Sequence, residues 1–221
     1  MSQVAVAFDR AAAEGRAAII GYLPAGFPSV DAGIEAALAM ARSGADIVEI
    51  GLPYSDPLMD GPVIQEAEHR ALAGGAGLIT PDLTPDEADP WLAEAAAHDL
   101  DAVFLAAVSS TPERIARIAA ACRGFVYAAS LMGVTGVRNA VSGDAEDLVG
   151  RIREHTTLPV AVGLGVRDGT QAAQVARFAD GVIVGSAFVR RLLAAGRPAD
   201  GIAAVAGLAA ELAAAVRLPA A

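Results

Sequence analysis

Lysine is absent from this chain, and all 16 of its basic residues are arginine. A protein lysine therefore cannot form a Schiff base with a carbonyl substrate. Cys122 is the only cysteine, which excludes an intrachain disulfide and a cysteine metal cluster. We expect Cys122 to be a small core residue. The three histidines, His69, His98 and His155, lack metal-ligand spacing, so we predict solvated helix faces for them and no metal site.

Aromatic residues are also scarce, at 5%, whereas 54% of the residues are hydrophobic. The core must therefore be built from alanine, valine, leucine and isoleucine. The net charge of −10 disfavours nucleic acid and anionic membrane surfaces as partners. No apolar run is expected to be long enough to span a bilayer, and residues 1–13 do not resemble a secretory signal. These features predict a cytoplasmic protein.

Strands alternate with helices along the chain, which predicts βα units and a parallel sheet. A chain of 221 residues suits one α/β domain, and we expect residues 1–221 to form it. The favoured fold is a TIM-type βα barrel with seven strands rather than the usual eight. An open doubly wound sheet is the alternative, and the lack of a GxGxxG motif weakens it. Strands are predicted at 17–22, 46–51, 77–81, 101–106, 124–129, 158–163 and 181–185, and helices at 1–16, 30–43, 62–73, 85–98, 111–121, 144–155, 168–178, after Gly185-Ser186, and at 198–216.

The strand at 46–51 carries one carboxylate, Glu49, among apolar neighbours. Both faces of this strand are otherwise apolar, so we expect the strand to be buried. Burial would raise the pKa of Glu49 and suit it to proton transfer near neutral pH. An acid-bearing loop with Asp56 and Asp60 follows, as in the active sites of βα barrels. The alternative is that Glu49 caps a buried arginine or a backbone N–H group.

Small residues end three of the late strands. Gly133-Val134-Thr135-Gly136 follows one strand, Gly163-Leu164-Gly165 ends the next, and Gly185-Ser186 ends the last and begins a helix. Glycine lets backbone N–H groups approach a ligand, and a helix start attracts anions. Glycine is also common in turns that bind no ligand. Two successive pairs of small residues at the ends of the last two strands nevertheless favour phosphate binding. Tyr127, inside an apolar strand, could line the site or fill the core.

The segment from Val48 to Gly61 resembles the signature of the tryptophan synthase α subunit family. The similarity extends to Gly21–Gly26, Pro62–Gln65, Tyr127–Gly136 and the glycine pairs above. The family is a βα barrel that cleaves indole-3-glycerol phosphate to indole and glyceraldehyde 3-phosphate. Its α chain uses no cofactor and passes indole to a β subunit that carries pyridoxal phosphate, in an α2β2 complex.

The resemblance implies a role for individual residues. Glu49 would protonate the indole ring carbon, and Asp60 would stabilise positive charge at the indole N–H. Thr135 would sit in a mobile loop that closes over the substrate. The remaining implied contacts fall into two groups: the phosphate would bind Gly136, Gly165, Gly185 and Ser186, and the indole would lie among Tyr22, Ile64, Tyr127, Ala129 and Leu164.

One long segment of the family pattern is missing. Family members have a helix, a strand and a second helix where this chain has only Gly74-Gly75-Ala76-Gly77. We therefore expect the strands at 46–51 and 77–81 to become direct neighbours, joined by the helix at 62–73. Two other functions stay open: a barrel that lost part of the indole pocket and no longer catalyses, and another sugar-phosphate enzyme of the barrel class.

Overall fold

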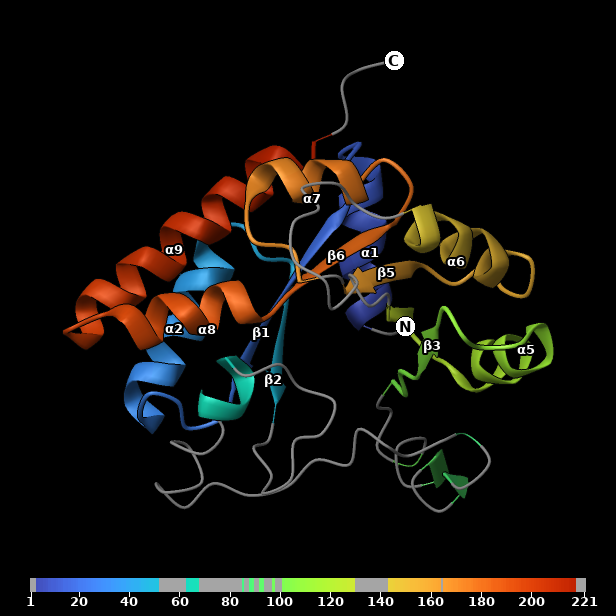
Figure 1. Cartoon of the computed structure of the whole chain (residues 1–221), viewed down its shortest axis with the longest axis horizontal. Helices are drawn as coiled ribbons and strands as arrows, with labels where there is room; N and C mark the ends of the chain where they lie inside the picture. The colour runs from blue at the N-terminus through green and yellow to red at the C-terminus, as the bar shows by residue number, and fades with distance from the viewer. Residues whose placement is uncertain are drawn as a thin grey trace.

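In the computed structural model, six parallel strands among the described residues form one sheet (Figure 1). The model describes residues 3–51, 63–67, 85, 88, 89, 92, 93, 97, 101–129, 143–163 and 165–217. The strand order is β2-β1-β6-β5-β4-β3. The strands are β1 (Ala18–Pro24), β2 (Ile47–Gly51), β3 (Leu105–Ala107), β4 (Val126–Ala129), β5 (Val160–Gly163) and β6 (Gly181–Val184).

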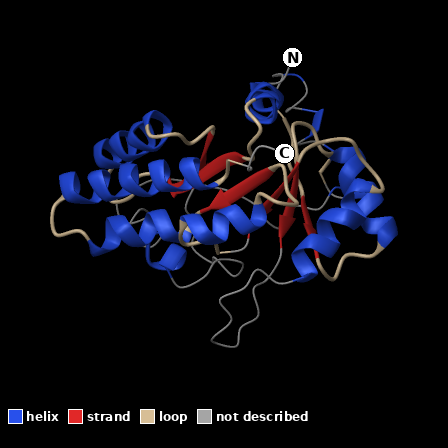
Figure 2. Cartoon of the chain, turned by 90° about the horizontal axis from the view of Figure 1, so that it is seen from above, coloured by secondary structure: helices blue, strands red, loops and turns tan. Residues whose placement is uncertain are grey.

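Helices lie on both flanks of these strands (Figure 2). Those with defined bounds are α1 (Gln3–Ala13), α2 (Val30–Arg42), α5 (Pro112–Ala121), α6 (Gly143–Arg153), α7 (Gly169–Val175), α8 (Ser186–Ala194) and α9 (Pro198–Ala215). Helix α9 packs against α2, α7 and α8, and α5 packs against α6. The two groups lie on opposite sides of the strands in Figure 1.

Most predicted elements are confirmed, with bounds that shift by a few residues. The strand predicted at 101–106 is shorter and later, since β3 covers only Leu105–Ala107. Within the helix predicted at 62–73, residues 63–67 are helical. The strand predicted at 77–81 lies outside the described residues, so its pairing with β2 stays a prediction.

Local capping explains where several helices begin. The Ser29 side chain accepts a hydrogen bond from the Ala32 N–H, which starts α2 at Val30. Thr111 and Asp168 do the same for α5 and α7. Gly44, at φ 113°, follows the end of α2 in a conformation that side chains rarely adopt.

The sheet separates two apolar clusters. The larger one lies mainly between the strands and the outer helices, includes Ile19, Met40 and Leu212, and also reaches Tyr22 near the carboxyl end of β1. The smaller one contains Ile20 of β1 and Ile183 of β6, and Ile47 of β2 and Tyr127 of β4 pack against it. Because strands near both ends of the sheet share this small cluster, the sheet curves around it, as in a barrel interior.

Helix α1 covers the amino-terminal end of this interior. Phe8 of α1 is 4% exposed, and its ring centroid lies 5.5 Å from that of Phe125. A Cβ atom on Gly181 would lie 2.9 Å from the Phe8 ring, so the aromatic ring fits closely against β6. Phe8 therefore closes the end of the sheet opposite to the carboxyl ends of the strands.

Strand β2 is less buried than the sequence predicted. Residues Ile47 to Ile50 are all at least partly exposed, and Ile50 is 46% exposed. The expectation of a strand buried on both faces was therefore wrong. The reason is its place in the sheet: β2 is a terminal strand of the described order, and β1 is its neighbour there.

Helix α9 corrects a second expectation. Its 18 residues, with a mean hydropathy of 1.3, are long and apolar enough to cross a membrane by length and composition. The prediction that no such run exists was therefore wrong. In the structure, Val205, Leu208 and Leu212 of α9 are buried in the larger apolar cluster.

Candidate active site

Glu49 lies near the carboxyl end of β2, directly beside Tyr22 of β1. The two residues are partners in the parallel register between these strands, and both are half-buried. Register partners in a parallel pair project from the same face of the sheet. Ile20 and Ile47 are the preceding pair of register partners on this face. Ile20 belongs to the smaller apolar cluster and Ile47 packs against it, and we call it the inner cluster from here on. Glu49 and Tyr22 therefore face the interior side of the curved sheet.

Tyr22 reaches across the carboxyl ends of three strands. Its hydroxyl and ring occupy the space that a Cβ atom on Gly51 of β2 would need. On the other side, a Cβ on Gly185, just after β6, would lie 3.3 Å from the Tyr22 ring. One aromatic ring thus lies between the end of the Glu49 strand and the turn predicted to bind phosphate.

Tyr127 repeats this arrangement on the other half of the sheet. Its hydroxyl lies where a Cβ atom on Gly163, at the end of β5, would have to be. Tyr127 is partly buried and packs against the inner cluster, so it both fills the core and borders the carboxyl ends of the strands. Ala129 follows on the same face and is the register partner of Gly163.

The start of α8 offers backbone donors at the end of β6. Gly185 is the N-cap residue and contributes no side-chain hydrogen bond. The first N–H groups of any helix lack an intrahelical acceptor, so those of Ser186 and Ala187 can meet an anion. Gly165, after β5, is exposed and has φ 66°, a conformation that suits glycine.

Several predicted site residues fall outside the described part of the chain. These are Asp60, Thr135, Gly136 and Leu164. Ile64 is described, is 6% exposed, and belongs to the apolar cluster against which Tyr22 packs. The structure thus brings together Glu49, Tyr22, Gly185 and Ser186, and it sets Tyr127, Ala129 and Gly165 on neighbouring strand ends.

A buried ion pair beside β2 was not expected from the sequence. The Asp46 side chain is 3% exposed and the Arg16 side chain 9%. Arg16 donates from Nη1 to Asp46 Oδ2 at 2.6 Å and from Nη2 to Oδ1 at 2.8 Å. Burial alone would raise the pKa of Asp46, but hydrogen bonds from Arg16 and from the Ile19 N–H hold it below its usual value. The available signal was an aspartate placed directly before an apolar strand.

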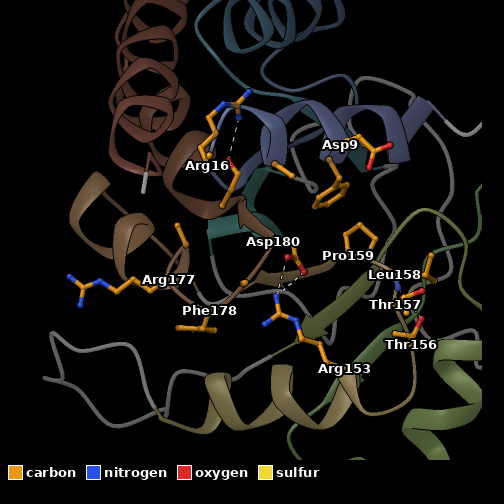
Figure 3. Close-up of a pocket in the computed structure, with 16 residues that line it drawn as sticks. Asp9, Arg16, Arg153, Thr156, Thr157, Leu158, Pro159, Arg177, Phe178 and Asp180 are labelled. Atoms are coloured by element: carbon orange, nitrogen blue, oxygen red, sulfur yellow. Dashed lines mark hydrogen bonds and ion pairs between the residues drawn. The ribbon is translucent and has the colours of Figure 1, made fainter. Parts of the chain in front are cut away.

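One open cavity lies at the opposite end of the sheet from Glu49. It measures about 650 Å³ and is bordered by α1 and by the segments that precede β5 and β6 (Figure 3). Phe8, Arg16, Arg153 and Asp180 are among its lining residues. Since Arg153 pairs with Asp180 there at 3.0 Å, and Glu49 does not line this cavity, we do not assign it to the reaction.

The expectation that Cys122 is a small core residue is confirmed, whereas His155 lies in the turn after α6 rather than on a helix, and His69 and His98 lie outside the described residues. Cys122 is 6% exposed, burial raises the pKa of its thiol, and the Phe104 N–H donates to its sulfur at 3.3 Å. His155 is exposed. Among the described residues, no group of three or more histidine, cysteine, aspartate or glutamate side chains is placed to hold a metal ion.

Comparison with known proteins gives one consistent result. The model of the tryptophan synthase alpha chain family matches residues 8–78 and 73–217. The tryptophan synthase alpha chain of Acidothermus cellulolyticus is 50% identical over 263 residues, which cover 98% of each chain. That of Mycobacteroides abscessus is 49% identical over 256 residues, which cover 95% of each.

These alignments also locate the missing segment. An alignment of 263 residues is longer than this chain of 221, so the relative carries residues that this chain lacks. The family match breaks into two pieces that meet at residues 73–78, where the sequence predicted the junction.

Solved structures agree with the fold. A structure of tryptophan synthase from Mycobacterium tuberculosis matches with a TM-score of 0.88 and 45% identity over 99% of both chains. The alpha subunit from Legionella pneumophila matches with a TM-score of 0.84 and 26% identity over 98% of both. The predicted α/β fold of the TIM-barrel type, with a parallel sheet, is confirmed.

Proposed function

The chain belongs to the tryptophan synthase alpha chain family, and from that premise we propose how its own residues carry out the family's reaction. The protein is a carbon–carbon lyase that cleaves indole-3-glycerol phosphate in tryptophan biosynthesis. The alpha chain needs no cofactor, since pyridoxal phosphate belongs to the beta subunit. The observation that carries our residue assignment is the register that sets Glu49 beside Tyr22 on the interior face.

Glu49 is the acid that starts the cleavage. Its carboxyl group gives a proton to carbon 3 of the indole ring, which leaves positive charge on the ring nitrogen. The bond between carbon 3 and the glycerol chain then breaks, and its electron pair returns to the ring. The neighbouring glycerol hydroxyl gives its proton to the Glu49 carboxylate as it becomes the aldehyde, which regenerates the acid, so indole and glyceraldehyde 3-phosphate form without an oxidant or reductant.

Asp60 supports the charge that this protonation creates. A carboxylate next to the indole N–H stabilises the protonated ring by a charge-assisted hydrogen bond. Asp60 lies outside the described residues, so its role rests on the family motif around Glu49. Tyr22, Ile64, Tyr127, Ala129 and Leu164 supply the apolar and aromatic walls for the ring, and Thr135 belongs to the loop that closes over it.

The phosphate binds at the ends of β5 and β6. Gly165, Gly185 and Ser186 present backbone N–H groups there, and Gly136 adds one from the preceding loop. Tyr22 supports this placement because its ring lies between Gly185 and Gly51, two residues beyond Glu49. The substrate would therefore lie with its phosphate toward α8 and its indole toward β2.

We propose that the partner is a tryptophan synthase beta subunit in an α2β2 complex. The matched solved structures are of tryptophan synthase, which is consistent with such a partner. The segment missing at residues 74–77 lowers the affinity for the beta subunit, because the relatives have additional residues at that position. The whole chain forms one barrel domain, and the protein acts in the cytoplasm.

Product analysis separates this function from the two alternatives. The purified chain, incubated with indole-3-glycerol phosphate, should release indole and glyceraldehyde 3-phosphate in equal amounts. A folded chain that binds the beta subunit but releases neither product would be a non-catalytic partner. Turnover of other sugar phosphates without indole release would point to a different barrel enzyme.

A further inference from the structure

Asp46 immediately precedes β2, the strand that carries Glu49. Its carboxylate accepts the Ile19 N–H of β1 at 3.0 Å, and its own N–H donates to the Ile19 carbonyl at 2.9 Å. These two hydrogen bonds connect Asp46 with Ile19. This pair lies immediately before Ile47 and Ile20, the first register partners of β2 and β1. The position of Asp46 along β1 therefore determines which residue of β1 stands beside Glu49.

Arg16 holds this carboxylate in place from the turn between α1 and β1. Its guanidinium makes two hydrogen bonds to Asp46, and its Nε donates to Glu14 at 2.8 Å. Arg10 of α1 also donates to Asp46 at 3.1 Å, which makes four donors to this carboxylate with Arg16 and the Ile19 N–H. A two-pronged guanidinium fixes the direction of a carboxylate as well as its charge.

The side chains of strand β2 are less buried than those of β6, the other neighbour of β1. Ile47, Val48 and Glu49 are only partly buried, and Ile50 is 46% exposed. The other strand that pairs with β1, β6, is buried along its whole length. Side-chain packing can hold β6 in register, whereas β2 depends more on the hydrogen bonds of Asp46, which we call its polar anchor.

We propose that Arg16 and Asp46 are positioning residues that hold β2 in the register that aims Glu49 at the substrate. This inference rests on the proposed role of Glu49. Neither residue touches the substrate, since Arg16 precedes β1 and Asp46 precedes β2, at the end of the sheet opposite to the phosphate turn. Their effect passes along the three residues from Asp46 to Glu49.

The chain contains a matched control at the same end of the sheet. Asp180 immediately precedes β6, accepts the Val160 N–H at 2.9 Å, and pairs with Arg153 at 3.0 Å (Figure 3). Like Asp46, Asp180 accepts a backbone N–H from the neighbouring strand and pairs with an arginine. The Arg153–Asp180 pair, however, is half-exposed and links β5 and β6. Disrupting it tests the loss of a similar anchor without touching the Glu49 strand.

The test compares Asp46→Asn, the double variant Arg16→Gln/Asp46→Asn, and Asp180→Asn. Asp46→Asn removes the buried charge partner of Arg16 and leaves only the partly exposed Glu14 carboxylate beside the guanidinium, so the urea midpoint should fall. Neutralising both partners removes that penalty, and the midpoint should recover in the double variant. Activity is measured well below each midpoint, as kcat and KM for indole release.

The positioning role predicts that stability and catalysis separate. In the double variant kcat should stay about 10- to 100-fold low, with KM within about 3-fold, because misplacing a catalytic group costs rate more than binding. Asp180→Asn should lower the midpoint and leave kcat unchanged. Recovery of kcat together with stability in the double variant, or an equal loss in Asp180→Asn, would overturn the inference.

Hydrogen exchange gives a readout that does not need turnover. Amides of residues 47–51 should exchange at least about 10-fold faster in the double variant than in the unchanged chain, and amides of 181–184 should not. Unchanged exchange in β2 would refute the anchor even in an inactive chain. Failure of the unchanged chain to release indole would instead refute the proposed function.

Discussion

The hydroxyl group of Tyr22 lies where a methyl group on Gly51 would have to be. Gly51 ends β2 on the same face as Glu49, and Tyr22 is the register partner of Glu49. Glycine at position 51 therefore allows the tyrosine side chain to pack against the end of the strand. The ring in turn sets one wall of the space that Glu49 faces.

Replacing Gly51 by alanine should displace this ring. We expect Gly51→Ala to lower kcat/KM for indole release by about 10- to 100-fold, because the ring and the neighbouring strand end must move apart. Gly207→Ala is the control: Gly207 lies on α9 with nothing within 4 Å of an added Cβ atom. That change should leave activity unchanged and stabilise the helix by about 0.5–1 kcal/mol. Wild-type kinetics for Gly51→Ala would contradict the close contact.

Phe8 should contribute much of the stability at the amino-terminal end of the sheet interior, which it closes. Removing its buried ring in Phe8→Ala should reduce the free energy of unfolding by about 3–5 kcal/mol. Val6→Ala on the same helix is the comparison, since Val6 is 41% exposed and its truncation should cost no more than about 0.5 kcal/mol. Urea unfolding of both variants measures the difference. Equal losses would mean that Phe8 does not close the inner cluster.

Asp46 should make the protein sensitive to acid. Its pKa is lowered in the folded state, so the ionised form stabilises the fold at any pH above the unfolded value of about 4. This contribution is lost as the pH falls from about 4 through the folded pKa. The urea midpoint of the unchanged chain should therefore drop in this range more steeply than that of Asp46→Asn. Parallel curves for the two proteins would show that Asp46 is not held ionised by Arg16.

Negative charge at the start of α8 should repel the substrate phosphate. We expect Ser186→Asp to raise KM for indole-3-glycerol phosphate by at least about 10-fold, because a carboxylate would take the place of the anion at the helix start. Ser186→Ala keeps the backbone donors and should change KM by less than about 3-fold. Inorganic phosphate should compete with the substrate in the unchanged chain and much less in Ser186→Asp. Equal KM values for the two variants would show that the substrate phosphate binds elsewhere.

The order of elements could be predicted from the sequence because each strand is a short apolar run between amphipathic helices. The Glu49 strand, the helix predicted at 30–43 and the turn at Gly185-Ser186 all lie where the pattern placed them. The family motif supplied the roles of Glu49 and Asp60, which apolar patterning alone left open against a capping role.

Burial and long-range contacts could not be predicted in the same way. The exposure of Ile50 follows from the terminal place of β2 in the described sheet. The sequence of one strand does not determine its place in the strand order. Arg16 and Asp46 are 30 residues apart, so their ion pair has no local signal. The seating of Tyr22 over Gly51 depends on the register between two strands, which the sequence pattern left undefined.

The central claim is that Glu49 is the acid that cleaves the substrate, and the Glu49→Gln variant tests it most directly. Glutamine keeps the size of the side chain but cannot supply the proton. We predict that kcat for indole release from indole-3-glycerol phosphate falls by at least about 100-fold, with KM within a few-fold and the urea midpoint not lowered. A folded Glu49→Gln protein that releases indole at the rate of the unchanged chain would contradict the account.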